Sequence, residues 1–242
     1  MRLIACLLIA GLLISSPALA KTSACLIAID AGHTYQKPGA TSARGVPEMQ
    51  FNMALAKKFQ KSLKKAHIRS FLTNPDGRIE HLIYRPWNAA KAGATLFISI
   101  HHDSTEPQLQ STWQWHGQEQ KYCDRFHGYG LYISAKNPHF DESLRAAQVA
   151  GDKLLAAKLT PALYHADPVL GENRPLLDKT RGIYQFDELV VLMYAAMPAL
   201  LVEAGVIVNR EEELRVSTSA YQDKIVAALT AAAVDHCSRL KP

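Results

Sequence analysis

Three side chains with metal-binding chemistry stand where apolar segments begin or end. His33 closely follows the apolar run from Cys25 to Asp30. His101 ends the run that starts at Leu96, and Glu48 opens a predicted helix. Two imidazoles and one carboxylate form the ligand set of a catalytic zinc site with an open fourth position. The spacing is not the local His-Glu-x-x-His pattern, so the alternative is three separate polar residues satisfied by local hydrogen bonds.

A fourth residue, Glu203, follows the apolar run Pro198–Val202 directly. A carboxylate in that place is costly unless it binds a metal, forms an ion pair or takes part in catalysis. Zinc lowers the pKa of its bound water to about 7, and a neighbouring carboxylate is then the natural general base. That carboxylate would pass the proton to a leaving nitrogen. The alternative for Glu203 is an ion pair with Arg181 or Arg210.

The elements that must position these residues alternate between strand-like and helix-like patterns. We therefore predict an α/β fold, a single domain with a mostly parallel mixed central sheet flanked by helices. Sites in such sheets collect at the carboxyl ends of strands, where we expect the zinc site. The expected strands are 25–30, 67–73, 96–100, 129–134 and 199–202, with a short apolar run at 189–193 as a further candidate. The expected helices are 48–66, 79–91, 141–159, 211–215 and 220–237.

Residues 103–127 do not fit this alternation. They are rich in Gln, Trp and His, carry Trp113, Trp115 and Cys123, and show no clear period. Long irregular segments in compact domains are usually functional or mobile, so we expect a surface insertion. Residues 160–179 are predicted to form a second, proline-containing loop.

The beginning of the chain has the pattern of an export signal. Met1-Arg2 is positively charged, Leu3–Ile14 is apolar but too short to span a bilayer, and Ala18-Leu19-Ala20 resembles a signal-peptidase site. We expect residues 1–20 to be a signal peptide and 21–242 to be the catalytic domain, with its core at about 26–233. The alternative is an uncleaved anchor. No transmembrane segment is expected after cleavage.

Cysteine content and charge fit an exported protein. Cys25, Cys123 and Cys237 remain after cleavage, and in an oxidising compartment two of them could pair. Pairing of Cys25 with Cys237 would tie the chain ends together and is favoured, although the other two pairings stay open. The net charge of +5 suits an anionic partner such as cell-wall polymer or nucleic acid. We expect no nucleic-acid partner, because no recognition motif is present.

Four separated motifs carry a resemblance to a known family. They are Ile29–His33, Glu48, Ser99–His101 and Pro198–Gly205, and they appear in the order seen in zinc-dependent N-acetylmuramoyl-L-alanine amidases. The chain resembles this family of bacterial cell-wall amidases with a single catalytic domain over roughly residues 26–233. The resemblance implies peptidoglycan hydrolysis at the amide between N-acetylmuramic acid and L-alanine. It also implies one Zn²⁺ per chain held by His33, Glu48 and His101, with Glu203 as the catalytic carboxylate.

The sequence departs from the family pattern at positions near these motifs. Thr34-Tyr35 follows His33 in place of two glycines, and His102-Asp103 follows His101 in place of a small residue and asparagine. The family usually has Ala-Asn after the arginine of the helix before the central strand, whereas Ala89-Ala90 follow Arg85 here.

Side chains alternate along a strand, so only one of two neighbouring histidines is expected to reach the metal. The resemblance favours His101. His102, Asp30 and Arg181 are then candidates for supporting the ligands or contacting substrate. Asp30 is the expected acceptor that orients a histidine, with a turn cap as its alternative. The remaining histidines, including His165, are expected to be surface or structural residues.

Other functions stay open from the sequence. The alternatives are another exported zinc-dependent amide or peptide hydrolase, and a non-catalytic wall-binding module. We expect export to the periplasm, or otherwise secretion or attachment to the cell wall. The expected partners are peptidoglycan or muropeptide and a protein activator, because some family members are held inactive by a helix over the zinc. Residues 160–188 could contain such an element.

Overall fold

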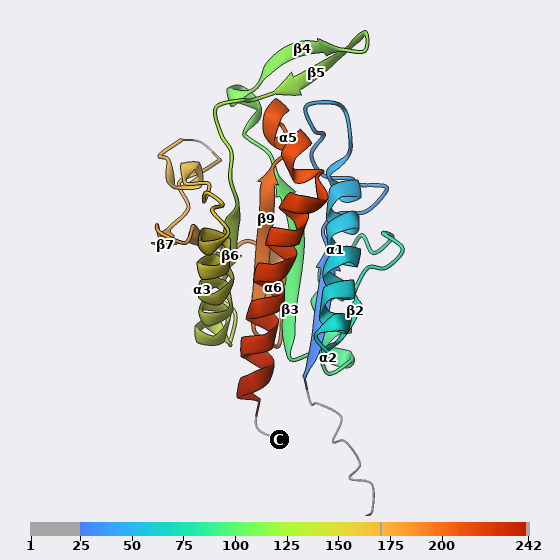
Figure 1. The fold of residues 1–242 in the computed structure, drawn as a ribbon, viewed down its shortest axis with the longest axis vertical. Helices are drawn as coiled ribbons and strands as arrows, with labels where there is room; N and C mark the ends of the chain where they lie inside the picture. The colour runs from blue at the N-terminus through green and yellow to red at the C-terminus, as the bar shows by residue number, and fades with distance from the viewer. Residues whose placement is uncertain (1–24, 170, 241–242) are drawn as a thin grey trace, which may run out of the picture.

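In residues 25–169 and 171–240, which the computed structural model describes, seven strands form one central sheet in the order β2-β1-β3-β9-β6-β8-β7 (Figure 1). The strands are β1 Leu26–Ala31, β2 Arg69–Leu72, β3 Leu96–Asp103, β6 Gly130–Ile133, β7 Leu176–Asp178, β8 Ile183–Gln185 and β9 Ala199–Val206. Strands β2, β1, β3 and β9 are parallel, whereas β6 runs antiparallel to β9. The mostly parallel mixed sheet is confirmed. The expected signal peptide lies outside the described residues.

Helices cover both faces of this sheet. One face packs against α1 Glu48–Lys65, α3 Phe140–Ala156 and α6 Ser219–Arg239. The other face packs against α2 Tyr84–Lys91 and α4 Val190–Met193, and α5 Arg210–Val216 follows β9. The helices pack on the sheet through an apolar stripe. In α1, Leu55, Phe59 and Leu63 recur every four residues and are buried against the sheet.

Alternation along β3 assigns its side chains to the two layers. Ile98 and Ile100 belong to the core under α1 and α6, and Phe97 belongs to the core under α2 and α4. A one-residue change in register would exchange these faces. Packing of the two apolar cores therefore fixes His101 on the face of Phe97 and His102 on the face of Ile98 and Ile100.

Three expectations for the secondary structure are wrong. The predicted loop at 160–179 contains the short strand β7 near its end. The run at 189–193 is not a strand but contains the short helix α4, since a short apolar run has too few residues to reveal its period. Residues 103–127 are not irregular, because β4 Ser111–Trp115 and β5 Gln118–Tyr122 form an antiparallel hairpin at the top of Figure 1. His116 and Gly117 turn the hairpin with φ of 48° and 76°, as tight two-residue hairpin turns require.

A disulfide joins the two ends of the described chain. The Sγ atoms of Cys25 and Cys237 are 2.03 Å apart, which links the start of β1 to the end of α6. This is the pair that the sequence analysis favours. Cys123 is buried and unpaired among the described cysteines.

Candidate metal centre

The candidate ligands meet at one edge of the sheet because neighbouring parallel strands end there. Ala31 of β1 pairs with Ile100 of β3, so the chain after β1 places His33 beside His101. Gly32 permits this approach, since a Cβ on it would lie only 2.2 Å from His101 Nε2. His33 itself has a φ of 68°, a backbone conformation that is uncommon outside glycine and is found at functional sites.

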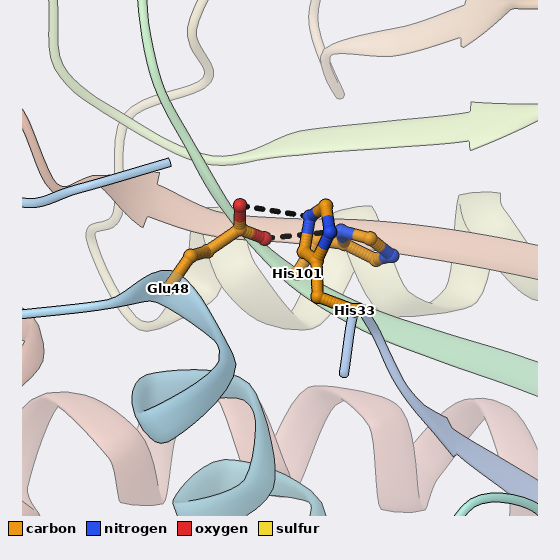
Figure 2. Close-up of side chains that lie close together, drawn as sticks. All are labelled: His33, Glu48 and His101. Atoms are coloured by element: carbon orange, nitrogen blue, oxygen red, sulfur yellow. Dashed lines mark hydrogen bonds and ion pairs between the residues drawn. The ribbon is translucent and has the colours of Figure 1, made fainter. Parts of the chain in front are cut away.

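The Glu48 carboxylate bonds both imidazoles. His33 Nε2 is 2.9 Å from Glu48 Oε2, and His101 Nδ1 is 3.0 Å from Glu48 Oε1 (Figure 2). The two rings lie edge to face, with centroids 4.9 Å apart. One ligand atom from each residue lies within 4.8 Å of the others, which is the arrangement of a site that could hold a metal ion. The structure therefore brings together the three predicted ligands.

The main chain and one amide side chain hold Glu48 in place. Ala40 N donates to Glu48 Oε2 at 3.1 Å, and Asn52 Nδ2 donates to Oε1 at 2.9 Å. Burial alone would raise the pKa of Glu48, but the imidazoles of His101 and His33 outweigh it and lower the pKa. The carboxylate is therefore ionised and ready to bind a cation.

Glu203 lies next to this cluster on β9, paired in register with His101. Its Oε2 atom is buried and has no hydrogen-bond partner within the described part of the chain. Burial, and then the carboxylates of Asp103 and Glu48, raise the pKa of Glu203 well above its usual range. An unpaired buried carboxyl oxygen costs free energy, which indicates a role that folding alone does not explain.

The ion-pair alternative for Glu203 is wrong, and so is the assignment of Arg181 to the site. Arg181 forms ion pairs with Asp152 and Asp178, each at 2.7 Å. It packs over Gly151 of α3 and lines neither cavity beside the two imidazoles. Arg210 is bound to Asp124.

His102 points to the α1 face of the sheet, as strand alternation predicts. Its Nδ1 lies 2.8 Å from Asn52 Oδ1, and its ring contacts Phe51. Burial is the largest cause of a pKa lowered to about 4, so the imidazole is neutral at physiological pH. Since Asn52 also bonds Glu48, His102 supports the candidate ligand from behind.

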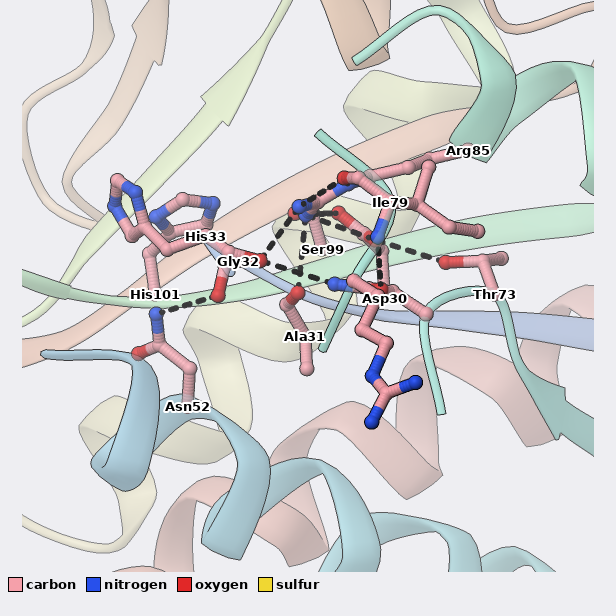
Figure 3. A network of polar contacts seen from close by, with 12 residues as sticks. Asp30, Ala31, Gly32, His33, Asn52, Thr73, Ile79, Arg85, Ser99 and His101 are labelled. Carbon is pink, nitrogen blue, oxygen red and sulfur yellow. Dashed lines mark hydrogen bonds and ion pairs between the residues drawn. The ribbon is translucent and has the colours of Figure 1, made fainter. Parts of the chain in front are cut away.

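Asp30 acts on the site through an arginine and not by bonding a histidine ring. Its buried carboxylate accepts hydrogen bonds from Thr73 and Ser99, each at 2.8 Å, and pairs with Arg85 at 3.3 Å (Figure 3). Arg85, also buried, donates to the main-chain oxygens of Ala31 and His33. The expectation that Asp30 orients an imidazole directly is therefore wrong. The pair fixes the backbone that carries His33.

A second polar cluster, which the sequence analysis did not predict, lies beside Glu203. His165 Nε2 is 2.6 Å from Asp103 Oδ2, and its Nδ1 is 2.7 Å from Glu172 Oε2. Tyr164 Oη also donates to Asp103, and Arg174 pairs with Glu172. Burial would lower the pKa of His165, but the two carboxylates outweigh it and raise the pKa to about 9.

Two cavities meet at the imidazoles of His33 and His101. One, the acidic cavity, has a volume of about 240 Å³. Its further lining includes Glu48, Asp103, Glu106 and Glu203. The other, the apolar cavity, has a volume of about 410 Å³. Its lining includes Leu82, Leu189, Val190, Val191 and Leu201, with Lys37 and Glu80.

A helix-flanked α/β sheet with a His-Glu-His cluster at its strand ends, open to two cavities, defines a class of candidate metal-dependent hydrolases. The profile of the N-acetylmuramoyl-L-alanine amidase family matches residues 27–235, and the chain belongs to this family. That match covers all the elements that carry the site.

Named relatives agree with the family match. The chain is 29% identical over 228 residues to the probable N-acetylmuramoyl-L-alanine amidase AmiB of Haemophilus influenzae, covering 82% of this chain and 49% of AmiB. It is 29% identical to AmiA of Salmonella typhimurium over 229 residues, covering 89% of this chain and 77% of AmiA. The chain thus spans about half the length of the first relative and about three quarters of the second.

The fold is shared with solved amidase structures. The Ami1 amidase of Mycobacterium smegmatis superposes with a TM-score of 0.70 at 17% identity, covering 90% of this chain and 99% of that one. Within residues 25–169 and 171–240, no helix is long and apolar enough to cross a membrane.

Proposed function

We propose that this protein is a zinc-dependent peptidoglycan hydrolase that cleaves the amide between N-acetylmuramic acid and L-alanine of the stem peptide. The observation that carries the proposal is the convergence of His33, Glu48 and His101 at the mouth of two cavities, beside the buried carboxyl group of Glu203. Family membership supports the substrate, since the relatives are named for this bond.

The donor set fits zinc. Two imidazole nitrogens and one carboxylate oxygen would hold the ion, and the cavity side leaves room for a further ligand. Zinc, when bound, supplies a Lewis acid and a water of lowered pKa. We propose one Zn²⁺ per chain.

Glu203 is the proposed proton carrier. It accepts a proton from the attacking water and delivers it to the departing nitrogen of L-alanine. Its raised pKa suits this role, because a carboxyl group with a raised pKa binds the transferred proton more readily before it passes that proton to the leaving amine. The neighbouring carboxylates raise the pKa of Glu203, and a cation held by the three ligands would lower it again. Glu203 could then also be ionised and accept a proton.

Several supporting roles follow from the same geometry. Asn52 and His102 hold the Glu48 carboxylate, and the Asp30–Arg85 pair fixes the main chain of His33.

We propose export of residues 21–242 to the periplasm after removal of residues 1–20, and regulation by a protein activator.

Product analysis tests the proposal. Zinc-loaded residues 21–242 are incubated with purified sacculi, and the products are identified by mass spectrometry. The expected products are glycan strands with free lactyl carboxylates and stem peptides that begin at L-alanine. Cleavage only inside the peptide or between sugars would overturn the assignment. Glu203→Gln protein serves as the matched inactive control.

A further inference from the structure

The two cavities that meet at His33 and His101 differ in charge, and this difference bears on how a substrate lies. Four carboxyl groups line the acidic cavity, from Glu48, Asp103, Glu106 and Glu203, and among these only Glu48 bonds the candidate ligands. The apolar cavity has a wall of aliphatic side chains, and its charged lining residues form two ion pairs, Lys37 with Glu80 and Arg85 with Asp30, so that its formal charges balance.

The two halves of the proposed substrate differ in the same way. On one side of the scissile amide stands N-acetylmuramic acid, whose only carboxyl group is consumed in the amide, so that the sugar is uncharged and rich in hydroxyls. On the other side stand the methyl group of L-alanine and a peptide that carries carboxylates. Among the carboxyl groups of the acidic cavity, that of Glu106 has no ion-pair partner in the described part of the chain, so a carboxylate-bearing peptide is disfavoured beside it.

We propose that the stem peptide occupies the apolar cavity, that Lys37 there binds the carboxylate nearest to L-alanine, and that the sugar lies over the acidic cavity. This inference rests on the proposed function and adds the direction in which the substrate crosses the site. The aliphatic wall formed by Leu82, Val190 and Val191 receives the alanine methyl group.

Lys37 is held at the mouth of the apolar cavity by the residues that depart from the family pattern. Thr34 Oγ1 accepts a hydrogen bond from Lys37 N at 3.0 Å, and Thr34 N donates to Lys37 O at 3.1 Å. Two glycines after His33 would lack the hydroxyl that closes this turn. The position of Lys37 therefore depends on Thr34, a residue that the usual family pattern lacks.

The ion pair of Lys37 with Glu80 does not block this role. The nitrogen–oxygen distance is 3.2 Å, and 74% of the Lys37 side chain is exposed. An ammonium group has three donors, and Glu80 engages one of them. Exposed ion pairs are weak, so a substrate carboxylate can share or replace Glu80 at little cost.

The acidic cavity has a matching feature on the sugar side. Thr105 lines it, and the buried Thr105 Oγ1 has no hydrogen-bond partner among the described residues. A hydroxyl group can both donate to and accept from the hydroxyls of a sugar. The neutral, hydrogen-bonding half of the substrate therefore fits this side.

Two synthetic muropeptides test the direction. They differ only in the residue after L-alanine, which is D-glutamate with a free α-carboxylate or D-isoglutamine with a carboxamide. For the zinc-loaded protein, we expect kcat/KM to be about three- to fivefold higher with the carboxylate, the size of an exposed ion pair. Lys37→Ala should remove this preference by raising KM for the carboxylate substrate, so that its kcat/KM falls to about that of the carboxamide. Lys57→Ala, an exposed lysine on α1 that lines neither cavity, should change nothing.

Binding of the released peptides gives a readout that does not depend on turnover. In isothermal titration, the carboxylate peptide should bind more weakly to Lys37→Ala than to the wild type, and still more weakly to Leu82→Asp, which places a negative charge on the aliphatic wall. Equal loss of both substrates in Lys37→Ala, or a preference that survives it, would overturn the inference. If the wild type cleaves neither muropeptides nor sacculi, the proposed function itself fails. If it cleaves both muropeptides equally well, only the direction fails.

Discussion

Two histidine–carboxylate clusters lie side by side at the same sheet edge, and they differ in how their charges balance. In the first, one carboxylate, Glu48, bonds two imidazoles, and these imidazoles line two cavities. In the second, one imidazole, His165, lies between Asp103 and Glu172 and is buried. The first has more imidazoles than carboxylates and opens to the cavities, which leaves room for a cation. The second already contains its cation, because the pKa of His165 is raised to about 9.

The comparison shows that residue types alone do not identify a metal site. Both clusters contain histidine and carboxylate at 2.6–3.0 Å. In the first cluster (His33, Glu48 and His101), imidazoles outnumber carboxylates and solvent has access, as in a set of metal ligands; we call it the open cluster. In the second (His165, Asp103 and Glu172), carboxylates outnumber the imidazole, which is buried, as in a structural network; we call it the closed cluster. We therefore interpret the second cluster as the anchor that fastens the segment after η2 Tyr164–Ala166 to the end of β3.

The largest expected effect is on catalysis beside the open cluster. Glu203→Gln removes the proton carrier while keeping the size of the side chain. We expect turnover of sacculi to fall by about 10²- to 10⁴-fold, the range for loss of a general acid–base group. Zinc content and circular dichroism serve as controls and should not change. Near-normal turnover would remove Glu203 from the mechanism.

The next effect concerns the open cluster itself. His101→Ala should weaken zinc binding by more than about 100-fold, beyond the loss caused by removing an outer hydrogen bond. Competition with a chromogenic chelator measures the affinity. His81→Ala, on an exposed residue, is the matched control and should bind zinc like the wild type. Equal zinc affinity in both variants would show that the metal lies elsewhere.

The closed cluster should respond to pH and not to zinc. The folded-state pKa of His165 is about 9 against an ordinary 6.5, so its contribution to stability is complete below pH 6.5 and is lost as the pH rises through 9. The shift corresponds to a contribution on the order of 3 kcal/mol. In urea unfolding of metal-free protein, His165→Gln should therefore lose less stability than the wild type between pH 6 and pH 10. Parallel losses in the two proteins would contradict a charged His165.

Arg181 provides the baseline for both clusters, because it contacts neither. Arg181→Ala removes ion pairs with Asp152 and Asp178 at a partly exposed position. We expect kcat/KM and zinc affinity to stay within about twofold of the wild type, since exposed pairs contribute little. A tenfold loss of either quantity would mean that Arg181 reaches the site in solution.

The sequence predicts the open cluster well because its geometry follows from strand ends. Apolar runs locate β1, β3 and β9, and parallel strands deliver the residues that follow them to one edge. The alternation of side chains also separates His101 from His102. What the sequence does not show is which partner each buried polar group finds. Asp30 meets Arg85, which is 55 residues away, and no local pattern records that contact.

The second cluster and the hairpin were missed for different reasons. His165 lies in a loop without periodicity, and its partner Asp103 is 62 residues away, so only the folded chain brings them together. The hairpin has a local signal in the sequence. Trp113 and Trp115 alternate with polar residues before His116-Gly117, the pattern of a strand entering a tight turn.

Zinc dependence tests the central claim most directly. Purified residues 21–242 are assayed for bound metal and for release of stem peptide from sacculi, before chelation, after chelation and after zinc is added back. We expect about one zinc per chain, loss of peptide release on chelation, and recovery with zinc. Full peptide release from protein that contains no metal would contradict a site built from His33, Glu48 and His101.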